Sequence, residues 1–136
     1  VDEPTSGLDP EERIRFRTLL SQLAERRTVL LSTHIVDDVA QTCTEVAVLG
    51  QGRLIYRGTV GDLTERARGQ VWSLVSGQAP PIGTVVAALP HDGATRYRIV
   101  AATRPAAGAE PVPPTLEDGY VALAQQHRLT TAGTTV

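Results

Sequence analysis

The sequence contains no lysine, no asparagine and no methionine, so all 13 of its basic residues are arginine. Its single cysteine, Cys43, excludes an internal disulfide and suits a reducing compartment. No apolar run approaches the roughly 20 residues of a membrane-spanning helix, so we expect no direct membrane insertion. A net charge of −2 and a pI near 5.9 give no electrostatic reason to expect a nucleic-acid partner.

Residues 1–35 carry one helix signal and one strand signal. Asp9 suits a helix N-cap, Pro10 suits the first helical position, and Glu12 completes a capping box. An apolar face at helical spacing follows, formed by Phe16, Leu19, Leu20 and Leu23. Residues 28–33 form a short run rich in apolar side chains, which predicts a strand covered on both faces. His34 lies at the carboxyl end of that strand.

Further elements are predicted over residues 36–69. Residues 36–43 have the apolar spacing of a second helix, and Asp37 and Asp38 suit its amino end. Residues 45–50 and 53–57 read as a hairpin across a Gln-Gly turn. Thr59 is expected to cap a helix that reaches about residue 68.

The composition changes after Gly69, and we place a domain boundary there, between residues 1–69 and residues 70–136. Residues 70–75 are a predicted strand, and residues 84–89 and 95–101 are predicted to pair across a turn at 91–93. A loop rich in alanine, proline and glycine covers 103–114. Thr115 is expected to cap a last helix that ends near residue 126. The second part is therefore a small α+β extension.

The first ten residues, Val-Asp-Glu-Pro-Thr-Ser-Gly-Leu-Asp-Pro, bring two adjacent carboxylates to a turn. Adjacent side chains on a strand diverge, so Asp2 and Glu3 can face different groups. Alone, such a pair favours a solvated face, and a lone histidine such as His34 favours a structural role. The complete string, followed at a suitable distance by Leu-Ser-Thr-His, resembles the Walker B, D-loop and H-loop segments of ABC-transporter ATPases.

This resemblance implies a role for each matching residue. Asp2 corresponds to the aspartate that orients the ligands of Mg²⁺, and Glu3 to the glutamate that polarises the attacking water. His34 corresponds to the histidine that contacts the γ-phosphate of ATP and the water. The D-loop segment consists of Ser6, Gly7, Leu8 and Asp9, and in the family it crosses to the second ATPase subunit.

The resemblance is strong over residues 1–66, which also contain Gly-Gln-Gly-Arg-Leu-Ile-Tyr-Arg-Gly. The extension resembles, more weakly, that of bacterial exporter-type ATPases that work with an ABC-2 permease. The chain has no Gly-x-x-x-x-Gly-Lys phosphate loop and no Leu-Ser-Gly-Gly-Gln signature. We therefore expect a C-terminal fragment that is inactive alone, without useful ATP affinity and with apolar surface exposed.

Together these features imply an α/β fold, the C-terminal part of a P-loop NTPase (RecA-like) core followed by the α+β extension. The expected function is ATP hydrolysis, with ATP and Mg²⁺, that energises transport, with export as the expected direction. Expected partners are a membrane permease and a second ATPase subunit, with a cytoplasmic location at the inner face of the plasma membrane. Two alternatives are a soluble ABC ATPase that has no permease, and a regulatory or dimerisation role for the extension.

Overall fold

The first helix begins where the sequence predicts it. In the computed structural model, which describes residues 1–134, helix α1 spans Pro10–Ala24. The Asp9 carboxylate accepts a hydrogen bond from the backbone N–H of Glu12 at 2.8 Å, which confirms the cap. Leu20 is buried, whereas Leu19 and Leu23 are 49% and 44% exposed. The apolar face of α1 is therefore only partly covered.

The predicted strand at residues 28–33 is wrong. Within the described residues, its pairing is limited to an isolated parallel bridge between Asp2 and Ser32. A strand is stabilised by a ladder of backbone hydrogen bonds, and the neighbouring residues 1–3 offer too short a partner for one. Helix α2 (Val36–Thr42) follows as predicted and packs against α1.

The predicted hairpin is confirmed. Strands β1 (Glu45–Gly50) and β2 (Arg53–Thr59) pair antiparallel, and the turn residues Gln51 and Gly52 have positive φ angles of 52° and 75°. Such turns match the twist of the strands they join. Helix α3 (Val60–Glu65) begins after Thr59, whose hydroxyl accepts the Asp62 N–H at 3.0 Å. It ends earlier than predicted, in a turn that leads to Gly69 at φ 79°.

A second antiparallel sheet follows, with the strand order β4-β5-β3-β6. Its strands are β3 (Val71–Ser76), β4 (Thr84–His91), β5 (Ala94–Val100) and the two-residue β6 (Glu110–Pro111). The β4–β5 hairpin turns at Asp92 and Gly93, as predicted. Strand β6 lies inside the predicted loop of residues 103–114, where two residues pair with the edge of β3.

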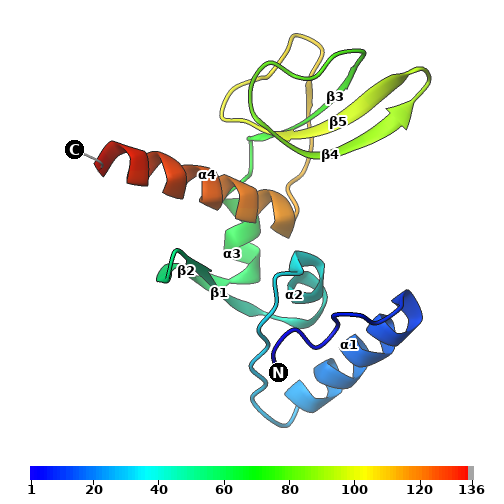
Figure 1. The fold of residues 1–136 in the computed structure, drawn as a ribbon, viewed down its shortest axis with the longest axis vertical. Coiled ribbons are helices and arrows are strands. Elements are labelled where there is room, and N and C mark those ends of the chain that lie inside the picture. The colour runs from blue at the N-terminus through cyan, green and yellow to red at the C-terminus, as the bar shows by residue number, and fades with distance from the viewer. Residues whose placement is uncertain (135–136) are drawn as a thin grey trace.

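Helix α4 (Leu116–Thr134) lies between the four-stranded sheet and the hairpin with α3 (Figure 1). It extends beyond the end predicted near residue 126, and both of its sides have apolar partners within the predicted part. Leu116 and Leu123 share a core with Val48, Tyr56 and Leu63. On the sheet side, Ala122 packs with Ala67, Val71 and Val100.

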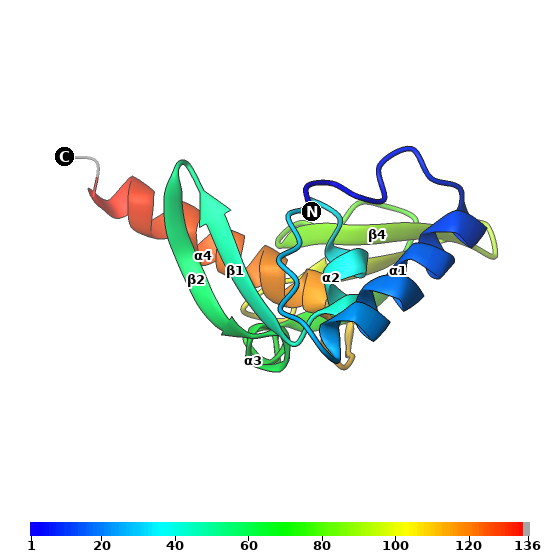
Figure 2. The ribbon, with the colours of Figure 1, turned by 90° about the horizontal axis from the view of Figure 1, so that it is seen from below.

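The hairpin β1–β2 runs beside α4, whereas α1 lies beyond α2 (Figure 2). The architecture is thus mixed α/β, in agreement with the expected class. Within residues 1–134, each helix is too short or too polar for a membrane crossing.

Candidate functional site

Backbone pairing brings residues 1–3 and 32–34 side by side. The Ser32 N–H donates to the Val1 carbonyl at 2.8 Å, and the Glu3 N–H donates to the Ser32 carbonyl at 2.6 Å. The two segments run parallel, so the residues that follow the pairing lie at the same end. Glu3 and His34 therefore meet, although 31 positions separate them in the sequence.

The Glu3 carboxylate holds His34 by two contacts. Its Oε1 atom accepts the backbone N–H of His34 at 2.9 Å and lies 2.7 Å from the ring Nδ1. Its Oε2 atom accepts the Thr33 hydroxyl at 3.4 Å. The His34 side chain remains 80% exposed, against 34% for Glu3. The carboxylate thus orients a ring that stays accessible to another molecule.

Hydrogen bonding also favours the ionised form of Glu3. The bond from the His34 ring is the largest reason that the pKa of Glu3 lies below its ordinary value, while burial opposes the shift. An ionised carboxylate only accepts hydrogen bonds, so Nδ1 carries the proton that is shared with Glu3. In this arrangement the other ring nitrogen, Nε2, accepts from a neighbour when the ring is neutral and donates when the ring is protonated.

The backbone of Glu3 has an uncommon conformation. Its φ angle is +47°, in the left-handed region that residues with a Cβ adopt rarely. The carbonyl of Glu3 accepts the Ser6 N–H at 3.2 Å, so the chain turns directly after the carboxylate. Strained backbone of this kind is concentrated at functional sites and needs support from the surrounding structure.

The four predicted D-loop residues form a turn at the surface. Ser6, Gly7 and Asp9 are exposed and Leu8 is half-buried, with Gly7 at φ +81°. Hydrogen bonding to the backbone N–H of Glu12 lowers the pKa of Asp9, so Asp9 carries a negative charge at the start of α1. This segment is therefore accessible at the surface.

Asp2 is exposed, and its neighbours do not complete a metal site. Within residues 1–134, no group of three or more His, Cys, Asp or Glu side chains is placed to hold a metal ion. A single carboxylate is nevertheless a usual protein contribution to Mg²⁺, which keeps several waters and takes further ligands from substrate phosphates. The residues therefore fit a Mg²⁺ ion only if a nucleotide brings its phosphates.

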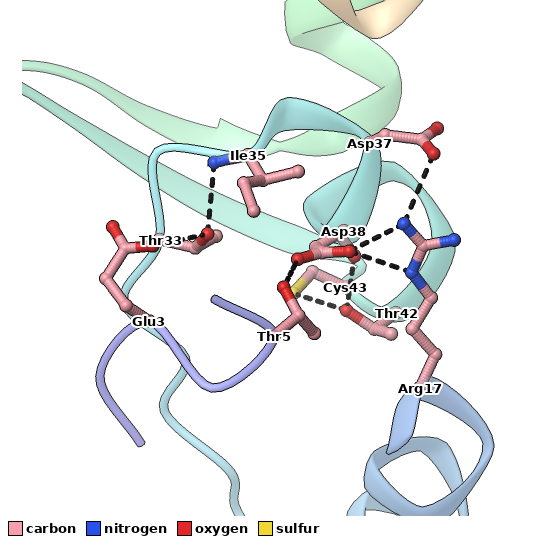
Figure 3. Close-up of polar contacts among 9 residues, drawn as sticks. All are labelled: Glu3, Thr5, Arg17, Thr33, Ile35, Asp37, Asp38, Thr42 and Cys43. Atoms are coloured by element: carbon pink, nitrogen blue, oxygen red, sulfur yellow. Dashed lines mark hydrogen bonds and ion pairs between the residues drawn. The ribbon is translucent and has the colours of Figure 1, made fainter. Parts of the chain in front are cut away.

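Next to the Glu3–His34 pair lies a buried polar cluster that we did not predict from the sequence. Asp38, 1% exposed, accepts two hydrogen bonds from Arg17, from Nε at 2.8 Å and from Nη2 at 2.6 Å. Its other oxygen accepts the hydroxyl of Thr5, which is 2% exposed (Figure 3). Asp37, at the surface, contacts Arg17 Nη2 at 3.2 Å. The cluster joins α1, α2 and the segment that follows Glu3.

Burial alone raises the pKa of Asp38, but the hydrogen bonds from Thr5 and Arg17 outweigh it and hold that pKa below its ordinary value. We expected Asp38 to serve the amino end of α2. A signal in the sequence could have found its partner: Arg17 precedes Leu20 by three positions, which puts it on the covered side of α1.

Known proteins similar in sequence to this chain include ABC transporter ATP-binding proteins. No family model matches the chain. It is 32% identical over 93 residues to an uncharacterised ABC transporter ATP-binding protein from Synechocystis, which covers 68% of this chain and 26% of that protein. It is 34% identical over 96 residues to the daunorubicin resistance ATP-binding protein DrrA3 from Streptomyces coeruleorubidus, covering 70% of this chain and 30% of that protein.

A third relative is the energy-coupling factor transporter ATP-binding protein EcfA2 from Streptococcus thermophilus. It is 43% identical over 67 residues, which are 48% of this chain and 24% of that protein. Over the matched residues, the chain is therefore similar in sequence to ABC transporter ATP-binding proteins. It spans between about a quarter and a third of the length of these relatives.

Proposed function

We propose that this chain supplies the water-activating part of an ATP site in an ABC transporter ATPase. The observation that carries the proposal is the contact of 2.7 Å between Glu3 Oε1 and His34 Nδ1. A carboxylate and an imidazole that meet at an exposed edge can orient a water and share its proton. The relatives, which are ABC transporter ATP-binding proteins, support this chemistry.

Each residue then has a defined task. Glu3, ionised, orients and deprotonates the water that attacks the γ-phosphate. His34 contacts the phosphate from Nε2, and as an imidazolium it donates there while Nδ1–H still donates to Glu3. Asp2 would hold part of the shell of a Mg²⁺ ion, whose chemistry is to neutralise charge on the phosphates. The phosphate cradle itself has to come from residues other than these, since the chain has no phosphate loop.

The wider assignment follows the same family. We place residues 1–69 in a P-loop NTPase core of the RecA-like type and residues 70–136 in an accessory extension. Ser6, Gly7, Leu8 and Asp9 would contact a second ATPase subunit, most simply a second copy. A membrane permease would hold the complex at the inner face of the membrane. Export is the proposed direction, supported by similarity to a Nod factor export ATP-binding protein from Ralstonia nicotianae.

The test is Glu3→Gln in a full-length protein that carries this sequence. Turnover of ATP should fall by about 10²-fold or more, the effect of removing a general base, while ATP binding persists. Glu25→Gln is the matched control, because Glu25 is an exposed glutamate at the far end of α1. Steady-state hydrolysis and equilibrium nucleotide binding measure the two effects. Unchanged turnover in Glu3→Gln would remove Glu3 from this role.

A further inference from the structure

The buried Asp38 cluster belongs to a ring of contacts that passes through Glu3 and through the residues on either side of His34. Thr5 lies two residues after Glu3 and donates its hydroxyl to Asp38. The Asp38 N–H donates to the Ile35 carbonyl at 3.1 Å, and the Ile35 N–H donates to the Thr33 hydroxyl at 3.0 Å. That hydroxyl in turn donates to Glu3 Oε2 at 3.4 Å, which returns the ring to its start (Figure 3).

This ring includes both segments that carry the proposed chemistry. Thr5 directly precedes the turn of Ser6 to Asp9, and Asp38 lies on α2, whose first residue comes two positions after His34. The Thr5–Asp38 bond therefore links the start of this turn to the helix that follows His34. That bond is buried at both ends, so water does not readily replace it.

Arg17 fixes the orientation of the Asp38 carboxylate within the ring. A carboxylate inside a protein needs partners for its charge, and two donors from one guanidinium also fix its orientation. The Arg17 side chain is 15% exposed and approaches Asp38 from α1. With one Asp38 oxygen held by Arg17, the other is directed at Thr5.

We propose that Thr5 and Asp38 are positioning residues that couple the Ser6–Asp9 turn to the orientation of Glu3 and His34. Movement of the turn, for instance when a second subunit contacts it, is transmitted through Thr5 to Asp38 and α2, and from there to His34. The consequence for catalysis rests on the proposed function. The mechanical coupling does not, because it depends only on contacts within residues 1–38.

Thr5→Val tests the coupling, because valine keeps the shape of threonine and leaves the Asp38–Arg17 pair in place. Thr5→Ser restores the hydroxyl, and Thr18→Val is the matched control, since the Thr18 hydroxyl donates to the Ile14 carbonyl within α1. We expect amide exchange over residues 32–38 to accelerate about tenfold or more in Thr5→Val, the factor for a lost hydrogen bond to a charged group. Hydrogen-exchange mass spectrometry of the full-length protein measures it.

The same samples give the catalytic readout. Thr5→Val should lower kcat about tenfold with the KM for ATP nearly unchanged, and Thr5→Ser should recover most of it. Exchange over 32–38 that is unchanged in Thr5→Val, or equally raised in Thr18→Val, overturns the coupling. If Glu3→Gln leaves turnover intact while Thr5→Val still accelerates exchange, the proposed function fails and the coupling stands.

Discussion

Residues 1–44 and residues 45–128 are held together by different interactions. In the first region the buried side chains are Thr5, Leu20 and Asp38, of which two are polar. In the second, most buried side chains are apolar and belong to three clusters around α4 and its sheet. The candidate site thus lies in the region that depends on directional polar contacts, while the other region supplies the apolar core.

Because of this difference, the two regions have different roles in the molecule. Apolar burial is non-directional and stabilises a shape, whereas hydrogen bonds fix the position of individual atoms. A site that must hold a carboxylate within 2.7 Å of an imidazole needs the second kind of support. The comparison predicts that the two regions respond differently to substitutions.

The largest loss of unfolding free energy is expected from Arg17→Met. The variant leaves the Asp38 carboxylate buried without its cation, which costs about 3–5 kcal/mol of unfolding free energy. Chemical denaturation measures this loss. Arg15→Met is the matched control on the same helix, because Arg15 makes only a surface pair with Glu11 and its loss should cost about 0–1 kcal/mol. Equal effects from the two variants would contradict the polar support of the first region.

In the second region, Gly119→Ala tests the apolar packing of α4. A Cβ at Gly119 would overlap the Leu63 carbonyl oxygen and lie 2.7 Å from its carbon, so α4 has to move away from α3. Overpacking of this kind costs about 1–3 kcal/mol. Gly61→Ala is the control, since a Cβ at Gly61 in α3 would meet the Thr59 hydroxyl oxygen at 4.0 Å, an ordinary contact, and alanine should stabilise that helix by about 0.5–1 kcal/mol. Denaturant midpoints compare the two.

The smallest expected effect is a dependence of the unfolding free energy on pH, to which both regions contribute. In the second region, the buried Asp118 accepts three hydrogen bonds from two nitrogens of Arg98, and two more from the backbone N–H and the hydroxyl of Thr115. Burial raises the pKa of Asp118, but these bonds outweigh it and lower that pKa, as in Asp38. A lowered folded pKa stabilises the protein above the unfolded value, near about 4, and this stability is lost as pH falls through the folded value.

Unfolding free energy should therefore be level near neutral pH and fall below about pH 4. Asp38→Asn and Asp118→Asn should each reduce that fall, one in each region. Thermal unfolding measured between about pH 2 and 7, at constant ionic strength, checks how steeply the unfolding free energy falls with pH. A wild-type slope that persists in both variants would mean that other groups govern acid unfolding.

Local signals predicted most helices and hairpins correctly. Asp9 and Thr59 begin α1 and α3 by bonding backbone N–H groups three residues ahead, and the Gln51–Gly52 turn matches its strands. Such features depend on neighbours in the sequence. The strand at 28–33 was wrong for a complementary reason, because strand formation depends on a partner that local pattern does not reveal.

In the candidate site, too, some features follow from local sequence and others from long-range packing. The string around Asp2 and Glu3, with His34 farther along, was enough to indicate both a family and a chemistry, because those residue types carry the reactivity. The 2.7 Å pairing of Glu3 with His34, the burial of Asp38 and its bonds to Thr5 and Arg17 came from long-range packing. The sequence specifies the reactive groups directly, whereas their orientation depends on which distant segments fold against one another.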